Sequence, residues 1–168
     1  LAAPRKPAFS FDLEPIRERV LGAGRIVIMG PVGAGKCQIA LQLATALALK
    51  TPELSPVFFF CGTGSRCDGA FLAHKSHLLG MDTRFDPPAD LPRIDTNAPQ
   101  IVVISGRNEN AAELARIALD RPGAIGILAL PAGLRRSRIE QAAQDWRGLF
   151  RGVVVSVSYG AEPDESER

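Results

Sequence analysis

A glycine-rich run with a single lysine is the part of this sequence whose residue types and spacing could do chemistry. The run reads Gly30-Pro31-Val32-Gly33-Ala34-Gly35-Lys36-Cys37. Glycines allow successive backbone N–H groups to turn inward around an oxyanion, and a lysine adds a cation that reaches the outer phosphates of a nucleotide. We therefore predict a phosphate-binding loop formed by Gly30, Gly33, Ala34, Gly35, Lys36, Cys37 and Gln38.

The residue after the lysine departs from the usual pattern of such a loop. A Ser or Thr is expected there because its hydroxyl oxygen holds Mg²⁺, but this chain has Cys37. A thiol is a soft ligand, whereas Mg²⁺ prefers hard oxygen ligands. We therefore expect phosphate binding with weak or absent Mg²⁺ binding and no metal site built from protein ligands. An alternative stays open: the thiol is tolerated, and water and phosphate oxygens hold Mg²⁺.

A phosphate loop must lie between a buried strand and a helix, and the flanking sequence predicts both. Five apolar runs are expected to be strands: 26–29, 57–60, 101–104, 125–130 and 153–157. None alternates polar with apolar residues, so each is expected to be buried on both faces. Stretches with helical spacing lie between these runs, beginning with Cys37–Lys50. The alternation predicts an α/β fold of the P-loop NTPase type, a three-layer sandwich with a mostly parallel sheet.

Helix ends and domain limits are predicted from capping residues and composition. The expected helix starts are Asp68, Asn110 (with Glu113) and Ser137 (with Glu140), and Gly80 is the expected stop of the first of these helices. Segment 82–99 is expected to be loop with a short edge strand. We divide the chain into an N-terminal extension with a short helix (1–24), a P-loop domain (25–160) and a polar tail (161–168).

The bulk properties limit the classes of function. The 168 residues are enough for one core, and the net charge of +2 comes from 20 basic and 18 acidic residues. That balance argues against nucleic acid as a general partner. No apolar run approaches the roughly 18 residues needed to span a bilayer. Three cysteines, an odd number, fit a reduced cytoplasmic compartment better than a disulfide framework.

From residue 11 to residue 159 the sequence resembles the signal-recognition-particle family of GTPases, and within it the FlhF-like group. The strongest part of the resemblance is the block Ile26–Leu43 around the phosphate loop. Two weaker parts follow in the same order as in the family: Ser65-Arg66 with its helix, and 128–132 with the next helix. The resemblance implies GTP or GDP as the ligand. It also implies that Arg66, Gly106 and Arg107 sense or contact the phosphates.

Several residues that serve catalysis in that family are replaced here. Two acidic positions near the metal and the attacking water align with Thr63 and Val103, and the guanine-reading Asp falls within 156–159, which reads Ser-Val-Ser-Tyr. Together with Cys37, these losses remove most of the apparatus for phosphoryl transfer. The expected protein is a degenerate pseudo-GTPase that binds nucleotide weakly or not at all.

For such a protein the resemblance implies a regulatory or scaffold role in bacterial flagellar placement. The expected partner is another protein or a second copy of the chain, and the expected location is the cytoplasm, peripherally at the inner membrane or cell pole. The alternative is an active Mg²⁺-dependent NTPase with relaxed base specificity, for which GTP and ATP both stay open.

Two further groups of residues have structural interpretations that we prefer to functional ones. Cys61, Cys67, His74 and His77 could form a zinc set, but the cysteines are spaced more widely than is usual and Cys61 ends a buried strand. The second group is a basic cluster at a helix start, Arg135, Arg136 and Arg138, which we interpret as a solvated loop.

Overall fold

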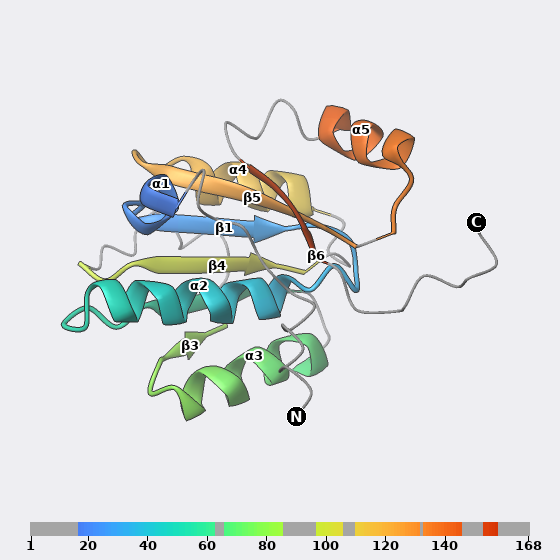
Figure 1. Ribbon diagram of the computed structural model, residues 1–168. Coiled ribbons are helices and arrows are strands. Elements are labelled where there is room, and N and C mark those ends of the chain that lie inside the picture. The colour runs from blue at the N-terminus through green and yellow to red at the C-terminus, as the bar shows by residue number, and fades with distance from the viewer. Residues whose placement is uncertain are drawn as a thin grey trace, which may run out of the picture.

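A computed structural model describes residues 17–62, 66–85, 97–105, 110–131, 133–145 and 153–157. Its strands are β1 (Arg25–Met29), β2 (Val57–Cys61), β3 (Thr83–Arg84), β4 (Gln100–Ile104), β5 (Ala124–Pro131) and β6 (Val153–Val157). Its helices are α1 (Arg17–Leu21), α2 (Lys36–Lys50), α3 (Arg66–Leu78), α4 (Ala111–Leu119) and α5 (Arg136–Asp145). The strands form one parallel sheet in the order β3-β2-β4-β1-β5-β6, with helices above and below it (Figure 1).

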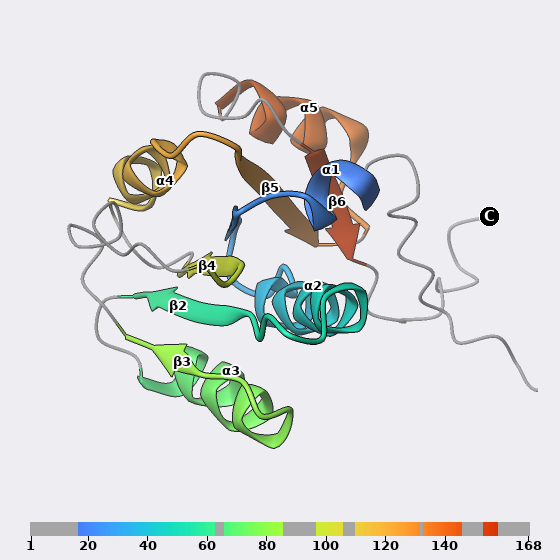
Figure 2. The same cartoon turned by 90° about the vertical axis from the view of Figure 1, so that its left-hand side faces the viewer.

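Both faces of the sheet are covered, which is why its strands read as unbroken apolar runs. Side chains alternate across a strand, so Ile26 and Ile28 of β1 pack toward α2, whereas Val27 and Met29 pack toward α4. Helices α1, α2 and α3 cover the first face, and α4 and α5 cover the second (Figure 2). This arrangement confirms the predicted α/β fold of the P-loop NTPase type.

All five predicted strands are present, and the edge strand expected between residues 82 and 99 is β3. The strands β1 and β4 each begin one residue earlier than the apolar runs indicated, at Arg25 and Gln100. These two residues are polar, but both are fully buried. Their side chains therefore belong to the interior at the amino ends of the central strands.

A buried polar contact joins β1, β4 and α4 at this amino edge of the sheet. Arg25 donates through Nε to Oε1 of Gln100 at 2.7 Å and through Nη1 to the backbone oxygen of Ala118 at 3.2 Å. Burial lowers the pKa of the Arg25 guanidinium, and the nearby charge of Arg121 lowers it further. The hydrogen bonds offset part of the cost of enclosing this charge.

Two of the predicted helix starts are wrong. The helix α3 begins at Arg66, so Asp68 lies inside its first turn rather than at its N-cap. The helix α5 begins at Arg136, so Ser137 is its second residue and does not open a capping box with Glu140. Instead, Arg136 Nε lies 2.8 Å from Oε1 of Glu140, and this i,i+4 ion pair uses the glutamate that the capping box would need.

The other predicted helix limits agree with the structure. Asn110 is the N-cap residue of α4, although its side chain makes no capping hydrogen bond. Gly80 ends the turn after α3 with a φ of +70°, a left-handed conformation that glycine adopts without steric cost. The N–H groups of Gly80 and Met81 donate to the carbonyls of His77 and Ser76, which closes the helix end.

The helix α1 lies where a short helix is expected before the phosphate loop. Its Val20 is fully buried in the same core cluster as α2. The remainder of the N-terminal extension and the whole polar tail lie outside the described residues, so the domain limits stay a prediction. Within the described ranges, no helix is both long enough and apolar enough to cross a membrane.

Candidate phosphate-binding site

The glycine-rich loop joins the carboxyl end of β1 to the amino end of α2, as the sequence predicts. The strand β1 is central, with β4 on one side and β5 on the other. In open parallel sheets, ligands bind at the carboxyl edge where chain connections diverge to the two sides. Here the chain leaves β1 toward β2 and later returns from β4 to β5 on the opposite side. The loop therefore occupies the position in the sheet that suits a ligand site.

Three glycines of the loop adopt positive φ angles: +144° at Gly30, +81° at Gly33 and +73° at Gly35. At Gly30 a Cβ would lie 2.0 Å from the backbone oxygen of Ala129 on β5, so a side chain does not fit. Gly35 is the N-cap residue of α2 in the left-handed region, whereas Gly33 faces open space. The first glycine is needed for packing against the sheet, and the other two for the turn itself.

The lysine lies over the backbone of its own loop. Nζ of Lys36 donates to the carbonyl oxygens of Gly30 at 2.9 Å and Pro31 at 2.6 Å. Inside the loop, Ala34 is fully buried, and its N–H donates to the carbonyl of Pro31 at 3.3 Å. The first turn of α2 has no acidic residue that would repel an anion. An ammonium and a helix N-terminus therefore meet at one place, which favours an oxyanion.

Two positions at which the family resemblance implies oxygen ligands or acids near Mg²⁺ carry side chains that pack in the core. Cys37 is half-buried and packs against the core cluster on the α2 face. Val103 of β4 is fully buried in that same cluster. The sequence resemblance aligns these two residues with the Mg²⁺-binding hydroxyl and a metal-proximal acid. A hard divalent cation would gain no oxygen ligand from either side chain.

The remaining predicted site residues are placed less completely. Gln38 lies half-buried in the first turn of α2. Arg66 is the first residue of α3, near the carboxyl edge of the sheet, but its side chain is not among those described. Gly106 and Arg107 lie outside the described residues.

Sequence reasoning missed a tightly packed corner at the carboxyl ends of β2 and β4. A Cβ at Gly62 would meet the Phe60 ring at 2.6 Å and Cβ of Ser105 at 3.3 Å. Ser105 is itself buried, and its N–H donates to the carbonyl of Cys61 at 2.8 Å. A glycine directly after a buried strand was the available signal, because such a position often marks a close approach of two chain segments.

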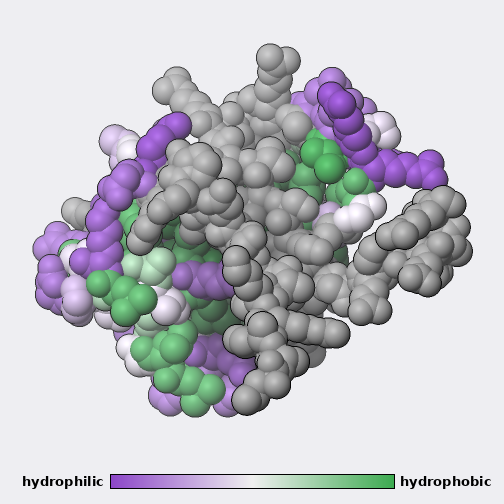
Figure 3. Space-filling view, in the orientation of Figure 1, coloured by the Kyte–Doolittle hydropathy of each residue, from purple (hydrophilic) through white to green (hydrophobic). Residues whose placement is uncertain are grey.

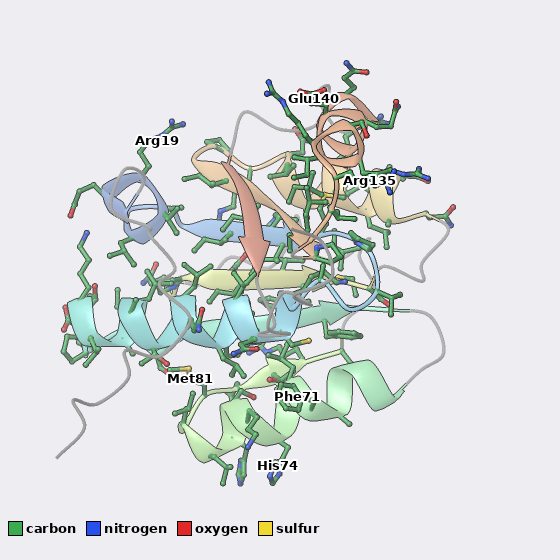
Figure 4. The ribbon with its side chains drawn as sticks, turned by 45° about the vertical axis from the view of Figure 1, so that its right-hand side comes forward. Arg19, Phe71, His74, Met81, Arg135 and Glu140 are labelled. Atoms are coloured by element: carbon green, nitrogen blue, oxygen red, sulfur yellow. The ribbon has the colours of Figure 1, made fainter. Side chains whose placement is uncertain are left out.

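The zinc interpretation finds no support among the described residues. Cys61 is buried in the core cluster on the α4 face, whereas His74 and His77 are exposed on α3. Figure 4 shows His74 pointing away from the sheet. Across the described ranges, no three His, Cys, Asp or Glu side chains gather where they could hold a metal ion. The side chain of Cys67 is not among those described.

The basic cluster is solvent-exposed, but Arg136 and Arg138 lie in the first turn of α5 rather than in a loop. Arg135, Arg136 and Arg138 all lie on the surface. Arg135 extends outward from the helix in Figure 4, where Glu140 is also labelled on the same helix.

The sheet order, the strand–loop–helix unit and the loop glycines together define the class: this is a P-loop NTPase-like α/β fold. No protein-family model and no curated protein matches the sequence significantly. Solved structures do match, and they are G domains of the signal-recognition-particle type.

Two of these structures are of FlhF, one complexed with GTP and Mg²⁺ and the other with GMPPNP and Mg²⁺. The first superposes with a TM-score of 0.63 at 14% identity and covers 79% of this chain and 55% of FlhF. The second gives 0.61 at 14% identity and covers 89% and 68%. The signal recognition particle receptor FtsY from Elizabethkingia anophelis gives 0.54 at 16% identity and covers 85% and 57%.

The chain is thus similar in fold to FlhF and FtsY, as the sequence resemblance implied. It spans a little over half to about two thirds of the length of the solved structures it matches. At these identities the likeness concerns the fold, and it leaves the ligand and activity of this chain to be argued from its own residues.

Proposed function

We propose that this protein is a degenerate, FlhF-like P-loop protein that binds nucleotide phosphates weakly and independently of Mg²⁺ and does not hydrolyse them efficiently. It would act as a regulatory or scaffold protein rather than as an NTPase. The similar FlhF structures contain GTP or GMPPNP with Mg²⁺, so a guanine nucleotide is the first ligand to test, and ATP is the second.

One observation carries the proposal: Cys37 packs against the apolar core cluster to which the fully buried Val103 belongs. The loop keeps the glycines and the Lys36 that would contact phosphates. The two positions that would lie near Mg²⁺ have no oxygen ligand. Mg²⁺ neutralises the charge that develops during phosphoryl transfer, so its loss reduces hydrolysis more than binding. A loop that can bind phosphates but offers no oxygen ligand to Mg²⁺ would suit a protein that binds nucleotide without hydrolysing it.

The decisive experiment is calorimetric titration of the full chain with GTP, GDP and ATP, each with and without Mg²⁺. We expect weak binding whose dissociation constant changes less than about twofold on adding Mg²⁺. Lys36→Ala is the control for the site, because it should abolish the binding that remains. Tight binding that needs Mg²⁺ and selects guanine would overturn the proposal.

A matched variant tests directly whether the thiol weakens Mg²⁺ binding. Cys37→Ser replaces sulfur by oxygen with little change in volume. In this variant Mg²⁺ should strengthen triphosphate binding by more than twofold and up to about tenfold. Because Val103 would remain, hydrolysis should stay negligible in this variant. If Cys37→Ser leaves the Mg²⁺ dependence unchanged, the thiol is not the reason for weak metal binding.

The second candidate is an active NTPase with relaxed base specificity. The presence of all three loop glycines and of Lys36 favours it. In that case water and phosphate oxygens would hold Mg²⁺, while Arg66 and Arg107 would supply the missing positive charge. Phosphate release assays separate the two candidates: Mg²⁺-stimulated turnover that disappears in Lys36→Ala supports the enzyme. The variant Arg66→Ala should then also weaken triphosphate binding, and unchanged affinity would exclude its role.

The biological role rests on the likeness to FlhF and on the resemblance of the loop region. We propose that the protein binds another protein, or a second copy of itself, in the placement of bacterial flagella at the inner membrane or cell pole. A fluorescent fusion that stays diffuse, together with unchanged flagellar number and position on gene deletion, would contradict this role.

A further inference from the structure

The outer side of helix α3 presents large apolar side chains to solvent. Six large apolar side chains are exposed within the described residues, and three of them belong to α3 and the turn that ends it. These are Phe71, which is 49% exposed, Leu78 at 65% and Leu79 at 49%. Figure 3 shows apolar surface at the lower left, where Figure 1 places α3. Exposed apolar residues that gather on one element usually mark a contact surface.

Helical spacing places the exposed residues of α3 on one continuous face. Among its described side chains, the exposed ones are those at positions 70, 71, 74, 75, 77 and 78. Residues three, four and seven positions apart lie on the same side of a helix. Phe71, His74, Lys75 and Leu78 have this spacing, and we call these four residues the α3 ridge. The ridge is about 10 Å long, because the helix rises 1.5 Å per residue.

The α3 ridge lies at the margin of the molecule. Helix α3 contacts α2 and β3, and β3 is the last strand at that end of the sheet. In Figure 2, α3 is the lowest helix and lies beside β3. On the inner side of α3, Leu72 and Ser76 are fully buried, whereas Figure 4 shows His74 pointing away from the sheet. The packed inner side therefore holds the helix in place while the ridge projects outward.

The charged and polar residues around the ridge have one sign of charge. Between residues 69 and 81 the sequence has one lysine and two histidines but no Asp or Glu. The nearest acids along the chain are Asp68, in the first turn of α3, and Asp82, after the helix. The ammonium group of Lys75 therefore lies between two apolar side chains of the ridge, Phe71 and Leu78. Such a face suits a partner that offers apolar material and negative charge together.

We propose that the α3 ridge docks on an anionic lipid surface. Phe71 and Leu78 would enter the boundary between headgroups and acyl chains, and Lys75 would contact the lipid phosphates. A projecting ridge enters a bilayer without a matching groove, whereas a protein partner would have to supply one.

A second copy of the chain fits the α3 ridge less well than a lipid surface does. Pairing two such ridges would bring two lysines of like charge together. Stable interfaces also need about 800 Å² from each partner, and a ridge about 10 Å long supplies a fraction of that. The proposal does not rest on nucleotide binding, so its test contains no nucleotide and leaves the proposed function untouched.

The test is flotation of the full chain with lipid vesicles. We expect binding to vesicles of phosphatidylglycerol and phosphatidylcholine in equal parts, and about tenfold weaker binding to phosphatidylcholine alone. The double variant Phe71→Ser/Leu78→Ser should weaken binding to the anionic vesicles by about tenfold or more, because it removes the apolar contact. Lys75→Gln should weaken it by about fivefold, since one lysine near an anionic surface contributes about that factor.

Two matched variants control for general effects of charge and apolar surface. Arg116→Gln removes an exposed cation from α4, which covers the opposite face of the sheet. Val32→Ser removes an apolar side chain that is 50% exposed outside α3. Both should bind anionic vesicles as the unmutated chain does, and circular dichroism checks that every variant is folded. Unchanged binding in the ridge variants, or equal losses in the controls, would overturn the proposal.

Tryptophan fluorescence locates the contact independently. The unmutated chain has a single tryptophan, Trp146, so Phe71→Trp adds one reporter on the ridge. Lipids brominated in the upper acyl chain should quench the added fluorescence in anionic vesicles and leave it unchanged in phosphatidylcholine vesicles. Bound protein without this quenching would overturn the proposal, because another surface would then make the contact. Failure to bind anionic vesicles would also overturn it, and an acidic protein would then be the partner to seek.

Discussion

The central strand β1 has a cation near each end, and the two cations have opposite surroundings. Arg25 at its start is fully buried and donates to Gln100 and to the carbonyl of Ala118. Lys36, after the loop at its other end, is partly exposed and donates to carbonyls of its own loop. The first cation joins elements that are distant in the sequence, whereas the second bonds residues five and six positions away.

This difference indicates which cation can serve a ligand. Replacing the acceptors of Arg25 would require α4 and β4 to separate, so its contacts are part of the fold. The acceptors of Lys36 lie in the loop itself, at the solvent-accessible edge of the sheet. A phosphate oxygen can approach that ammonium without any movement of the core. We therefore expect the two cations to affect different measurements when they are removed.

The largest effect should come from Arg25→Ala. It removes a buried guanidinium and leaves the Gln100 side chain without this donor, so the free energy of unfolding should fall by about 3–5 kcal/mol. Urea unfolding measures the change, and Arg116→Ala, on the exposed side of α4, is the matched control. A loss below about 1 kcal/mol would mean that the amino-edge contact is not a structural anchor.

The next effect should come from Gly30→Ala, where the loop meets the sheet. A Cβ there would overlap the carbonyl oxygen of Ala129, so we expect a loss of about 3 kcal/mol in stability and disruption of the loop. Gly33→Ala introduces an unfavourable φ but meets no atom within 4 Å, so it should cost only about 1 kcal/mol. Equal losses in the two variants would contradict the close approach of the loop to β5.

Lys36→Ala should reverse the pattern expected for Arg25→Ala. Its two hydrogen bonds join partly exposed groups that water can satisfy, so stability should change by less than about 1 kcal/mol. Binding of a triphosphate should weaken by about 30-fold or more, because a charge-assisted contact to phosphate is lost. Titration calorimetry measures the affinity, and Lys50→Ala serves as the control lysine. A large loss of stability would show that Lys36, like Arg25, is a structural cation.

The strands and the glycine-rich turn from β1 to α2 could be predicted from the sequence because their signals are local and strong. A strand buried on both faces must be apolar throughout, and a turn with positive φ angles favours glycine. The polar anchor was not predictable in the same way. Arg25 and Gln100 precede apolar runs, so they read as the residues just outside two strands. Their burial depends on β1, β4 and α4 meeting, which local sequence does not encode.

The wrong helix starts have a similar explanation. Ser137 and Glu140 have the spacing of a capping box, but the same spacing occurs inside a helix, where Glu140 pairs with Arg136. Asp68 likewise suits both an N-cap and the first turn of a helix, where a carboxylate also interacts well with the helix dipole. Capping signals locate a helix start to within a turn, and the pairing of neighbouring side chains decides the residue.

The smallest effect should come from the exposed pair of Arg136 and Glu140. This pair tests whether burial explains why Arg25 and Lys36 should contribute differently to stability. The pair is short, at 2.8 Å, but its side chains are 92% and 58% exposed. Solvent screens such a pair, so Glu140→Gln should lower the stability by about 0.3–0.5 kcal/mol at low salt. In 1 M NaCl the difference should vanish, since the screening length falls to about 3 Å. If Glu140→Gln instead lowered the free energy of unfolding as much as Arg25→Ala, hydrogen-bond geometry rather than burial would determine how much a cation contributes to stability. The contrast between Arg25 and Lys36 would then no longer indicate which of the two cations can serve a ligand.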